Sequence, residues 1–447
     1  MARQSALLLI ACVGGNIRHS LRDRSDAADV TTPDSSGDIA QRKDRATGHL
    51  SKFERTRQPG KTGRVLHLLK VFRPDFTGAG IFLERATLLF DQLAPGVEHD
   101  LLVVDTPRPA APVRALSRLR NIIYLQDAQL SPWRVEFALV RWLLFNARRY
   151  DVVHFHTHAD RFLFGYLLAK LLGKRLVMTA TLDDSAPKLL ETYRRPYRPL
   201  VRTILRFFDA FIAISPKLYE ESLPVLGPDK VHFIPIGVAI PSAPDKDRQA
   251  KRTAHGLSGE DVVLIFVGGI CARKDPMFLV EQMPAVCKFS PHAKLIIVGP
   301  ILETDHYARM LDYIEQHNLK DHVVFKGEVL DPYPFFAIAD IVVFASHLEG
   351  FGCAVTEGMA HGLPAVCRHL PRVNDLFIRD GKTGFFFTSP TEYLSAIRKL
   401  VEDPALRQDL GATARELIAA EFSNFKNAER IMSVYGFMPE GEARQAP

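Results

Sequence analysis

The sequence predicts an α/β protein with two doubly wound, Rossmann-like parallel-sheet domains that face a central cleft. The chain has 447 residues, more than one ordinary hydrophobic core holds, so two domains are expected. Short runs that are apolar throughout, such as DVVHFH at residues 151–156, alternate with segments of helical spacing, as in a parallel sheet covered on both faces. A stretch rich in proline and charge, PSAPDKDRQAKR at residues 241–252, interrupts this alternation and predicts a linker.

The first domain begins where apolar periodicity begins, near Arg64. VLHLLKVF predicts a buried strand, RPDFTGAG a turn-rich loop and IFLERATLLFDQLA a helix. Further strands are expected at residues 100–105, 151–156, 175–181, 210–215 and 231–237, with helices at 135–149 and 162–173 and a basic helix that ends at Phe208.

The alternation restarts after the linker. Strands of a second sheet are expected at residues 261–269, 294–300, 322–329, 340–346 and 363–368, with helices between them. We therefore divide the chain into a leader at 1–60, an N-terminal domain at 61–240, a linker at 241–258, a C-terminal domain at 259–425, and a final helix with its tail at 426–447.

Residues 1–60 are rich in Ser, Asp, Arg and Thr without apolar periodicity, which is typical of a disordered leader. Within it, SALLLIAC resembles a short signal sequence that ends in Cys12, but its apolar run is close to the lower limit of about 7 residues, so export is the disfavoured alternative.

The five cysteines form no CxxC pair, which favours free thiols in a reducing compartment. No apolar run reaches the roughly 20 residues of a spanning helix. We expect a cytoplasmic protein.

The charge balance favours an anionic ligand or an anionic membrane face. Lys and Arg number 57 against 51 Asp and Glu, which gives a net charge of +6. Because basic and acidic residues are interspersed and no nucleic-acid-binding module is present, we expect no nucleic-acid partner.

The stretch SHLEGFGCAVTEGMAHGLPAV at residues 346–366 places two carboxylates, Glu349 and Glu357, around a glycine-rich turn. The turn follows a predicted strand and precedes a helix, so the first N–H groups of that helix are expected to hold a phosphate. The two acids could then grip opposite ends of an elongated ligand. Taken alone, acids near a helix start are also common as dipole partners.

Two other predicted strands are followed by glycines. In one case basic residues come next, and in the other the glycines leave the backbone accessible to a ligand. FVGGICARKDP delivers Arg273 and Lys274 next to Gly268, where they could neutralise charge on a leaving phosphate, or could form a solvated pair. TGAG, with Gly78 and Gly80, lets backbone approach a diphosphate or an acceptor closely.

Together these segments, with GEV near Gly327 and the GLP of residues 362–364, resemble the family-4 retaining glycosyltransferases of GT-B fold, which belong to glycosyltransferase group 1. The resemblance covers about residues 64–438, and its most specific part is EGFGCAVTEGMAHGLPAV, which looks like the E-x7-E signature of the family.

The resemblance implies roles for particular residues. Glu349 is expected to contact the donor sugar and Glu357 the ribose hydroxyls, while Lys274 and Arg273 act in catalysis on the diphosphate. The donor site is completed by Gly268, Gly327 and the backbone of Gly350, Phe351, Gly352 and Cys353. The final helix is expected to return to the N-terminal domain.

The resemblance also implies a reaction. Such enzymes move a sugar, often a hexose, from a nucleotide-diphosphate sugar to a hydroxyl acceptor, with no metal, no cofactor and no covalent nucleophile. The protein then acts mainly by positioning and charge stabilisation. The expected acceptor is a glycan or a lipid-linked sugar in polysaccharide or glycolipid assembly.

Three departures from the family pattern keep a second hypothesis open. Gly269 stands where the family usually has Arg, Asp183 replaces a histidine near the acceptor, and IGVA replaces an NGVD-like stretch. The alternative is a non-catalytic scaffold that binds a nucleotide or a glycan. The retained Glu349, Glu357 and Lys274 favour the enzyme.

HFHTH places His154, His156 and His158 at alternate positions, the HxH spacing of some metal-dependent hydrolases. Because no further ligands are evident, we expect His154, His156 and Asp183 to line the acceptor side of the cleft instead.

The run YRRPYRPLVRTILRFF at residues 193–208 fits either of two interpretations. It could make peripheral contact with an anionic membrane, on the inner face of the cell membrane, or it could form an amphipathic helix packed on its own sheet.

Overall fold

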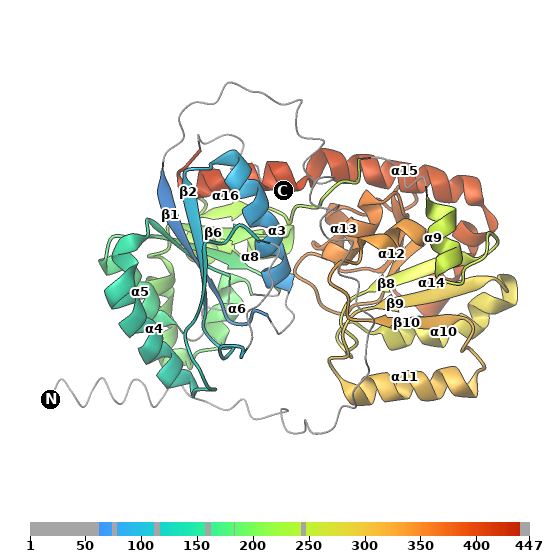
Figure 1. Cartoon of the computed structure of the whole chain (residues 1–447), viewed down its shortest axis with the longest axis horizontal. Helices are drawn as coiled ribbons and strands as arrows, with labels where there is room; N and C mark the ends of the chain where they lie inside the picture. Colours follow the sequence, from blue (N-terminus) through green and yellow to red (C-terminus); the bar gives the residue numbers. More distant parts are fainter. Residues whose placement is uncertain are drawn as a thin grey trace. The chain divides into compact units, whose positions relative to one another are not determined.

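The computed structural model describes residues 62–73, 78–110, 117–156, 162–182, 184–242 and 247–438. The predicted leader, including Cys12, and Asp183 and His158 lie outside these residues. Two parallel sheets organise the described chain, as Figure 1 shows in blue to green for the first sheet and in yellow to orange for the second. The predicted fold class is thereby confirmed.

The first sheet has seven parallel strands in the order β3-β2-β1-β4-β5-β6-β7. Their bounds are Gly63–Leu69 (β1), Val97–Val103 (β2), Asn121–Tyr124 (β3), Val152–Phe155 (β4), Arg175–Ala180 (β5), Ala210–Ala213 (β6) and Val231–Phe233 (β7). The order reverses between β1 and β4, and in doubly wound sheets ligands bind outside the strand ends at such a point.

The second sheet has six parallel strands in the order β10-β9-β8-β11-β12-β13. Their bounds are Val262–Val267 (β8), Ala293–Val298 (β9), Val323–Gly327 (β10), Ile341–Phe344 (β11), Ala365–Arg368 (β12) and Gly384–Phe387 (β13). Here the order reverses between β8 and β11, which places the loops after these two strands beside each other.

Helices cover both faces of the sheets. In the first half they are Gly78–Leu93 (α3), Pro132–Asn146 (α4), Leu163–Leu171 (α5), Ala186–Glu191 (α6), Arg198–Leu205 (α7) and Pro216–Leu226 (α8). In the second half they are Arg248–Ala254 (α9), Pro276–Phe289 (α10), Thr304–Gln316 (α11), Tyr333–Ile338 (α12), Cys353–Ala360 (α13), Pro390–Glu402 (α14), Pro404–Glu421 (α15) and Asn424–Tyr435 (α16). Among the described residues, no helix is both long enough and apolar enough to cross a membrane.

The structure adds two strands that the sequence did not predict. These are β3 and β13, four residues each, and both lie at an edge of their sheet. An edge strand pairs on one side only and can be short, so its apolar run is weak as a sequence signal.

Two predicted loops are partly helical. Helix α3 begins at Gly78, so the GAG of residues 78–80 lies in the first turn of a helix and not in a loop before it. Helix α9 occupies the second half of the predicted linker, where Arg252 is only 2% exposed and donates to the carbonyl of Ile338 and the carboxylate of Asp340. A buried arginine fixes this segment to the second sheet.

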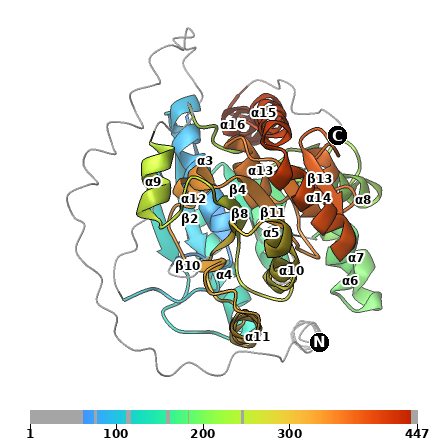
Figure 2. The same cartoon turned by 90° about the vertical axis from the view of Figure 1, so that its right-hand side faces the viewer.

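The two sides of the first sheet pack against different helices. Val65 and Val152 face α3 and α16, where Phe90 and Met432 are buried, whereas Leu66 and other residues of the opposite side face α4, α5 and α7. Figure 2 gives a second view of α16, which follows α15 and closes over the first sheet. The first half of the chain contacts the junction between α15 and α16 at Val238, whose backbone forms hydrogen bonds with the backbone of Phe422 and Asn424.

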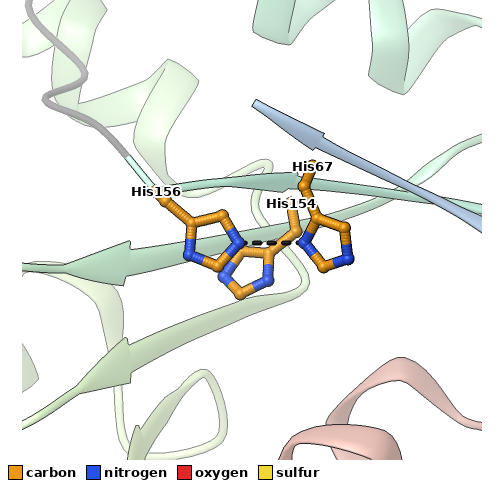
Figure 3. Close-up of side chains that lie close together, drawn as sticks. All are labelled: His67, His154 and His156. Carbon is orange, nitrogen blue, oxygen red and sulfur yellow. Dashed lines mark hydrogen bonds between the residues drawn. The ribbon is translucent and has the colours of Figure 1, made fainter. Parts of the chain in front are cut away.

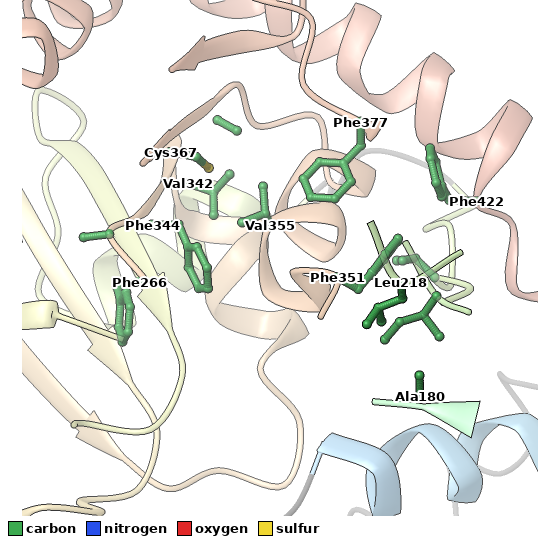
Figure 4. Packing of buried hydrophobic residues seen from close by; sticks show 14 of the residues in the cluster. Ala180, Leu218, Phe266, Val342, Phe344, Phe351, Val355, Cys367, Phe377 and Phe422 are labelled. Atoms are coloured by element: carbon green, nitrogen blue, oxygen red, sulfur yellow. The ribbon is translucent and has the colours of Figure 1, made fainter. Parts of the chain in front are cut away.

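The core of the second half continues under the glycine-rich turn. The Phe351 ring is buried and lies 5.5 Å from the ring of Phe377 and 5.9 Å from that of Phe422, as Figure 4 shows. This packing anchors the turn in the core, so its backbone is held in one place.

Candidate functional site

The centre of the candidate site is the turn between β11 and α13. Gly352 stands just before α13 with φ 110° and ψ 48°, in the left-handed region that glycine adopts without strain. Because glycine has no side chain, it supplies no capping oxygen to the N–H groups of the first helical turn. Those N–H groups, at the positive end of the helix dipole, suit an anion.

Gly350 lets this turn approach the first half of the chain. A Cβ atom added at Gly350 would lie 2.3 Å from the carbonyl oxygen of Thr181 and 2.6 Å from that of Leu182. Neither contact could be relieved by a side-chain movement, because both neighbours are backbone. The turn therefore lies against Thr181 and Leu182, the two residues that follow β5.

Glu349 is the acceptor of a compact basic cluster. Its Oε1 atom accepts from Lys274 Nζ at 2.9 Å and from Arg273 Nη1 at 3.0 Å. Ser346 Oγ, which is fully buried, donates to the same oxygen at 2.8 Å. The carboxylate side chain is 11% exposed and that of Lys274 is 18% exposed, so the charges are shielded from water without being sealed off.

A second ion-paired layer fixes the two loops that carry this cluster. Asp275 accepts from Arg368 Nη2 at 2.8 Å and contacts His347 Nε2 at 3.1 Å. The backbone N–H of His347 donates to the carbonyl of Arg273. Asp275 also caps α10, by accepting from the backbone N–H of Phe278. These contacts set the position of Lys274 relative to Glu349.

The glycines before Lys274 explain how it reaches the cluster. A Cβ atom at Gly268 would lie 2.9 Å from Lys274 Cδ, so the lysine stem packs across this glycine. A Cβ atom at Gly269 would lie 2.4 Å from Cδ1 of Leu302. A side chain at position 269 would therefore clash with Leu302 unless that leucine moved.

Glu357 lies further along α13 and is paired with the first half of the chain. Arg85 of α3 donates from Nη1 to Glu357 Oε1 at 2.6 Å and to the hydroxyl of Tyr333 at 3.0 Å. The Arg85 guanidinium also stacks on the Tyr333 ring, 4.7 Å from its centroid. Burial raises the pKa of Glu357, and the Arg85 charge opposes that rise. Arg85 thus stabilises the charged form of a buried carboxylate.

Cys353 begins α13 between the two acids. Burial raises the pKa of its thiol to about 12, and the negative charges of Glu357 and Glu349 add to the rise. The thiol is therefore neutral at physiological pH and is unsuited to act as a nucleophile. Its contribution to the turn is its backbone.

Of the other predicted glycines, Gly78 and Gly327 are exposed and Gly80 is buried. Gly327 ends β10 with φ 67°, is exposed, and accepts at its carbonyl from the backbone N–H of Gly299. Gly78 is exposed with no atom near a Cβ position, whereas Gly80 is buried in the first turn of α3. Their contact with a ligand stays a prediction.

His154 and His156 lie inside the first half and not on a surface. His154 is 1% and His156 4% exposed, and with His67 of β1 they form the group drawn in Figure 3. His67 Nδ1 lies 3.0 Å from His156 Nε2, and His67 Nε2 lies 3.0 Å from His99 Nδ1. In this conformation neither predicted histidine is open to an acceptor, because α3 and α16 cover this side of the sheet.

The histidine cluster is held by neutral partners. His154 contacts the hydroxyl of Tyr435 at 2.6 Å and that of Thr179 at 2.7 Å. Burial lowers the pKa of His99 to about 4 and that of His156 to about 3, and it lowers the pKa of His67 and His154 well below the usual value. All four rings are therefore neutral at pH 7.

These histidines have the ligand type that zinc takes, and ring nitrogens of His67, His154 and His156 lie within 4.8 Å of one another. Both nitrogens of His154 are already hydrogen-bonded, and no described carboxylate or thiolate contacts any of the three rings. A divalent ion would bring uncompensated charge into a buried place, so the donor set fits a hydrogen-bonded network better than a metal centre.

An open pocket of about 570 Å³ lies beside α9, α12 and α15. Tyr333 and His361 line it, together with Arg248, Lys251 and Arg415, but Lys274, Glu349 and the glycine-rich turn do not. The arginines there are engaged, since Arg248 pairs with Asp340 and Arg415 donates to the carbonyl of Pro241. The pocket is thus distinct from the charged cluster at Glu349.

Several residues of the site were missed from the sequence. Ser346 stands three positions before Glu349 and could have been found as a polar residue at a strand end, as could Asp275 after Lys274. Arg85, Tyr333 and Arg368 come from other elements, and nothing in local spacing connects them to Glu357 or Asp275.

Two family descriptions match the chain in succession. Residues 87–240 match "Glycosyltransferase Family 4" and residues 247–417 match "Glycosyl transferases group 1". The first range contains β2 to β7 and the second contains β8 to β13, and together they cover well over half of the chain.

Similar proteins agree with these matches. The chain is 22% identical over 296 residues to an N-acetyl-alpha-D-glucosaminyl L-malate synthase of Bacillus anthracis, covering 64% of this chain and 74% of that protein. It is 28% identical over 193 residues to the capsular polysaccharide biosynthesis glycosyltransferase CapM of Staphylococcus aureus, covering 42% and 50%. The crystal structure of HepE from Anabaena in complex with UDP and glucose superposes with a TM-score of 0.65 at 18% identity, covering 84% of this chain and 100% of that one.

The matches to both halves and the shared two-sheet fold confirm the resemblance drawn from the E-x7-E stretch: the chain belongs to the family-4, group 1 glycosyltransferases of GT-B fold.

Proposed function

We propose that this glycosyltransferase is a retaining enzyme that moves a sugar from a nucleotide-diphosphate sugar to a hydroxyl acceptor. The observation that carries the proposal is the convergence of Lys274, Arg273 and Ser346 on one oxygen of Glu349, beside the uncapped start of α13. This arrangement gathers positive charge and backbone N–H groups where a diphosphate would lie.

The donor is proposed to lie across the start of α13. The diphosphate would contact the N–H groups after Gly352 and the side chain of Lys274, the ribose would contact Glu357, and the sugar would contact Glu349. HepE, solved with UDP and glucose, supports a uridine nucleotide as the first donor to test. The residues after Gly327 are proposed to lie beside the base.

One oxygen of Glu349 and one of Glu357 are engaged by cations in this structure, and we propose that donor binding exchanges these partners. Lys274 would turn from Glu349 to the diphosphate, and Arg85 would yield one oxygen of Glu357 to the ribose. Both acids then keep a hydrogen-bonding partner, which matters because an unpaired buried carboxylate is costly.

In the proposed step, the acceptor oxygen attacks the anomeric carbon on the face that the diphosphate leaves. The bond from that carbon to the diphosphate oxygen breaks, the new glycosidic bond forms, and the acceptor proton passes to the departing diphosphate. Lys274 and Arg273 stabilise the negative charge that develops on the leaving group. We propose that no metal and no cofactor take part.

The acceptor is proposed to be a glycan or a lipid-linked sugar in polysaccharide or glycolipid assembly, in the cytoplasm. The similarity to CapM supports this class. The segment after Thr181, against which Gly350 packs, is the proposed entrance for the acceptor.

Thermal unfolding with UDP, GDP and ADP and with their common sugar conjugates tests the donor assignment, because a ligand that binds only the folded state raises Tm. We expect a shift with one nucleotide family and a much smaller shift in Glu357→Gln. Sugar release from the selected donor, in the presence of glycan extracts, then separates enzyme from scaffold. A Tm shift without any release would favour a binding scaffold, and no shift with any nucleotide would contradict the donor site.

A further inference from the structure

The outer side of the helix layer α4, α5 and α7 exposes an unusual amount of aromatic and aliphatic surface. Trp133, Phe137 and Phe145 of α4 are 56%, 67% and 71% exposed, and Leu171 at the end of α5 is 75% exposed. The other exposed large apolar residues of this layer are Leu144, Phe164, Leu200 and Phe207. Monomeric soluble proteins rarely leave apolar groups of this size together in water without a use for them.

These residues form one surface because the three helices pack side by side. A Cβ atom at Gly165 of α5 would lie 3.0 Å from Leu139 of α4, and the Tyr166 ring of α5 lies 4.9 Å from that of Phe208, which follows α7. Figure 1 shows α4 and α5 together on one side of the first sheet, and Figure 2 shows α7 beside α6. A layer of helices on one side of a sheet turns its outer sides the same way.

On α4 the exposed apolar residues recur at helical spacing. Trp133, Phe137, Leu144 and Phe145 lie on the outer side, while Leu139 and other buried positions face the sheet. The helix is therefore apolar on both sides. Folding explains only the inner side, so the outer one needs a separate explanation.

The charges of the same surface are of one sign. Arg134, Arg141, Arg148 and Arg149 are exposed along α4 and its end, and none of them forms an ion pair with a described residue. On and near α7 the exposed cations are Arg194, Arg195, Arg202 and Arg206.

The acids of these elements do not cancel that charge. Glu136 turns inward and accepts from the backbone N–H of Gly165, and burial raises its pKa to about 7. Asp209 is paired with Lys170. Among the described acids of α4, α5, α6 and α7, Glu191 alone is exposed and forms no ion pair with a described residue.

We propose that this surface, α4, α5 and α7, docks on an anionic lipid bilayer. Aromatic side chains beside arginines match the boundary between acyl chains and phosphate headgroups, where the rings lie in the apolar layer and the guanidinium groups reach the phosphates. Each cation near an anionic membrane adds to the attraction. The sequence alone indicated residues 193–208; the structure adds α4, which supplies most of the aromatic area.

The surface lies on the first half, whereas Lys274 and Glu349 belong to loops of the second half. Docking is therefore independent of the proposed donor site, and a change on α4 is expected to leave donor binding intact.

Co-sedimentation of the full chain with vesicles tests the proposal. We expect binding to vesicles of equal parts phosphatidylcholine and phosphatidylglycerol, little binding to phosphatidylcholine alone, and weakening by salt, because exposed charges are screened within a Debye length of about 8 Å at physiological ionic strength. The triple variant Trp133→Ser, Phe137→Ser, Phe145→Ser should bind the anionic vesicles at least tenfold more weakly. Arg134→Gln, Arg141→Gln, Arg148→Gln should do so as well and should lose most of the salt dependence.

The control is Leu311→Ser, because Leu311 of α11 is an apolar residue of the second half that is 42% exposed. This variant should bind vesicles as the unchanged protein does. Because all substituted side chains are exposed, thermal unfolding should be unchanged, and this is checked for each variant. Equal binding to neutral and anionic vesicles, or unchanged binding of both triple variants, would overturn the proposal. So would a dimer in solution that the serine variant abolishes, because the surface would then join two copies of the chain.

Discussion

The two halves of the molecule each carry a cluster of ionisable side chains, and the clusters differ in what surrounds them. Around Glu349, a carboxylate, a lysine and an arginine form ion pairs at partly exposed positions between loops. Around His67, four imidazoles lie between a sheet and two helices, and burial keeps them neutral. A titratable group is thus available for ligand chemistry when it is ion-paired and partly exposed to solvent. It becomes part of the hydrophobic core when it is fully buried and neutral.

The histidine cluster should make the first half sensitive to acid, and this is the largest effect we expect. A histidine with a usual pKa near 6.5 when unfolded and about 4 or lower when folded binds a proton only in the unfolded state between these values. Stability is therefore full above pH 6.5 and falls as pH decreases toward about 4. Between pH 7 and pH 5 the loss is about 2 kcal/mol for each such histidine.

Amide hydrogen exchange at pH 7 and pH 5 locates this loss. Protection factors, which correct for the slower intrinsic exchange at the lower pH, should fall in β1, β4 and α16 far more than in β8 to β12. The variant His156→Gln takes up one proton fewer on unfolding. The slope of its unfolding free energy against pH should therefore decrease by about 1.4 kcal/mol per pH unit. An equal response of both halves to acid would contradict the role assigned to the cluster.

The charged cluster should instead control turnover. Glu349→Ala and Lys274→Ala should each lower the rate of sugar transfer by about 10²-fold or more, since each removes a group placed at the reacting centre. Tm should change little. Initial rates with the donor selected by thermal unfolding measure the effect, and turnover at the unchanged rate in both variants would refute the assignment.

Arg85→Ala should have an intermediate effect, because it removes the cation that opposes the raised pKa of Glu357. At pH 6 we expect nucleotide affinity to fall about tenfold, as for the loss of a charged hydrogen bond. The loss should become smaller as pH rises, because without the Arg85 charge burial raises the pKa of Glu357 further, and this weakens binding most at low pH. Titration calorimetry with UDP at both pH values checks this, with Tyr333→Phe as the milder comparison; equal losses at both pH values would exclude a protonation effect.

Ser346→Ala should have the smallest effect. Glu349 Oε1 keeps Lys274 and Arg273 as donors when the hydroxyl is lost, so turnover should fall by only a few-fold, as for one neutral hydrogen bond of about 1 kcal/mol. A loss as large as that of Lys274→Ala would mean that Ser346 positions Glu349 by itself. A crystal structure of the variant with Glu349 unmoved would then decide between positioning and a direct role.

The sequence by itself determined the order of strands and helices, the two-sheet fold and the glycine-rich turn with its two acids. These features are local, because apolar runs, helical spacing and glycine positions act over a few residues. It also brought Lys274 and Glu349 into one hypothesis, since both follow strands of the same sheet, and the distance of 2.9 Å agrees with it.

Only the tertiary structure decided which polar residues are buried and which stay accessible to solvent. The HFHTH stretch gave no indication that His67 and Tyr435, far apart in the chain, would enclose His154. The pairing of Arg85 with Glu357 and the outward turn of Phe137 are likewise set by how α3 and α4 pack, since burial and partner choice depend on elements that meet only in the folded chain.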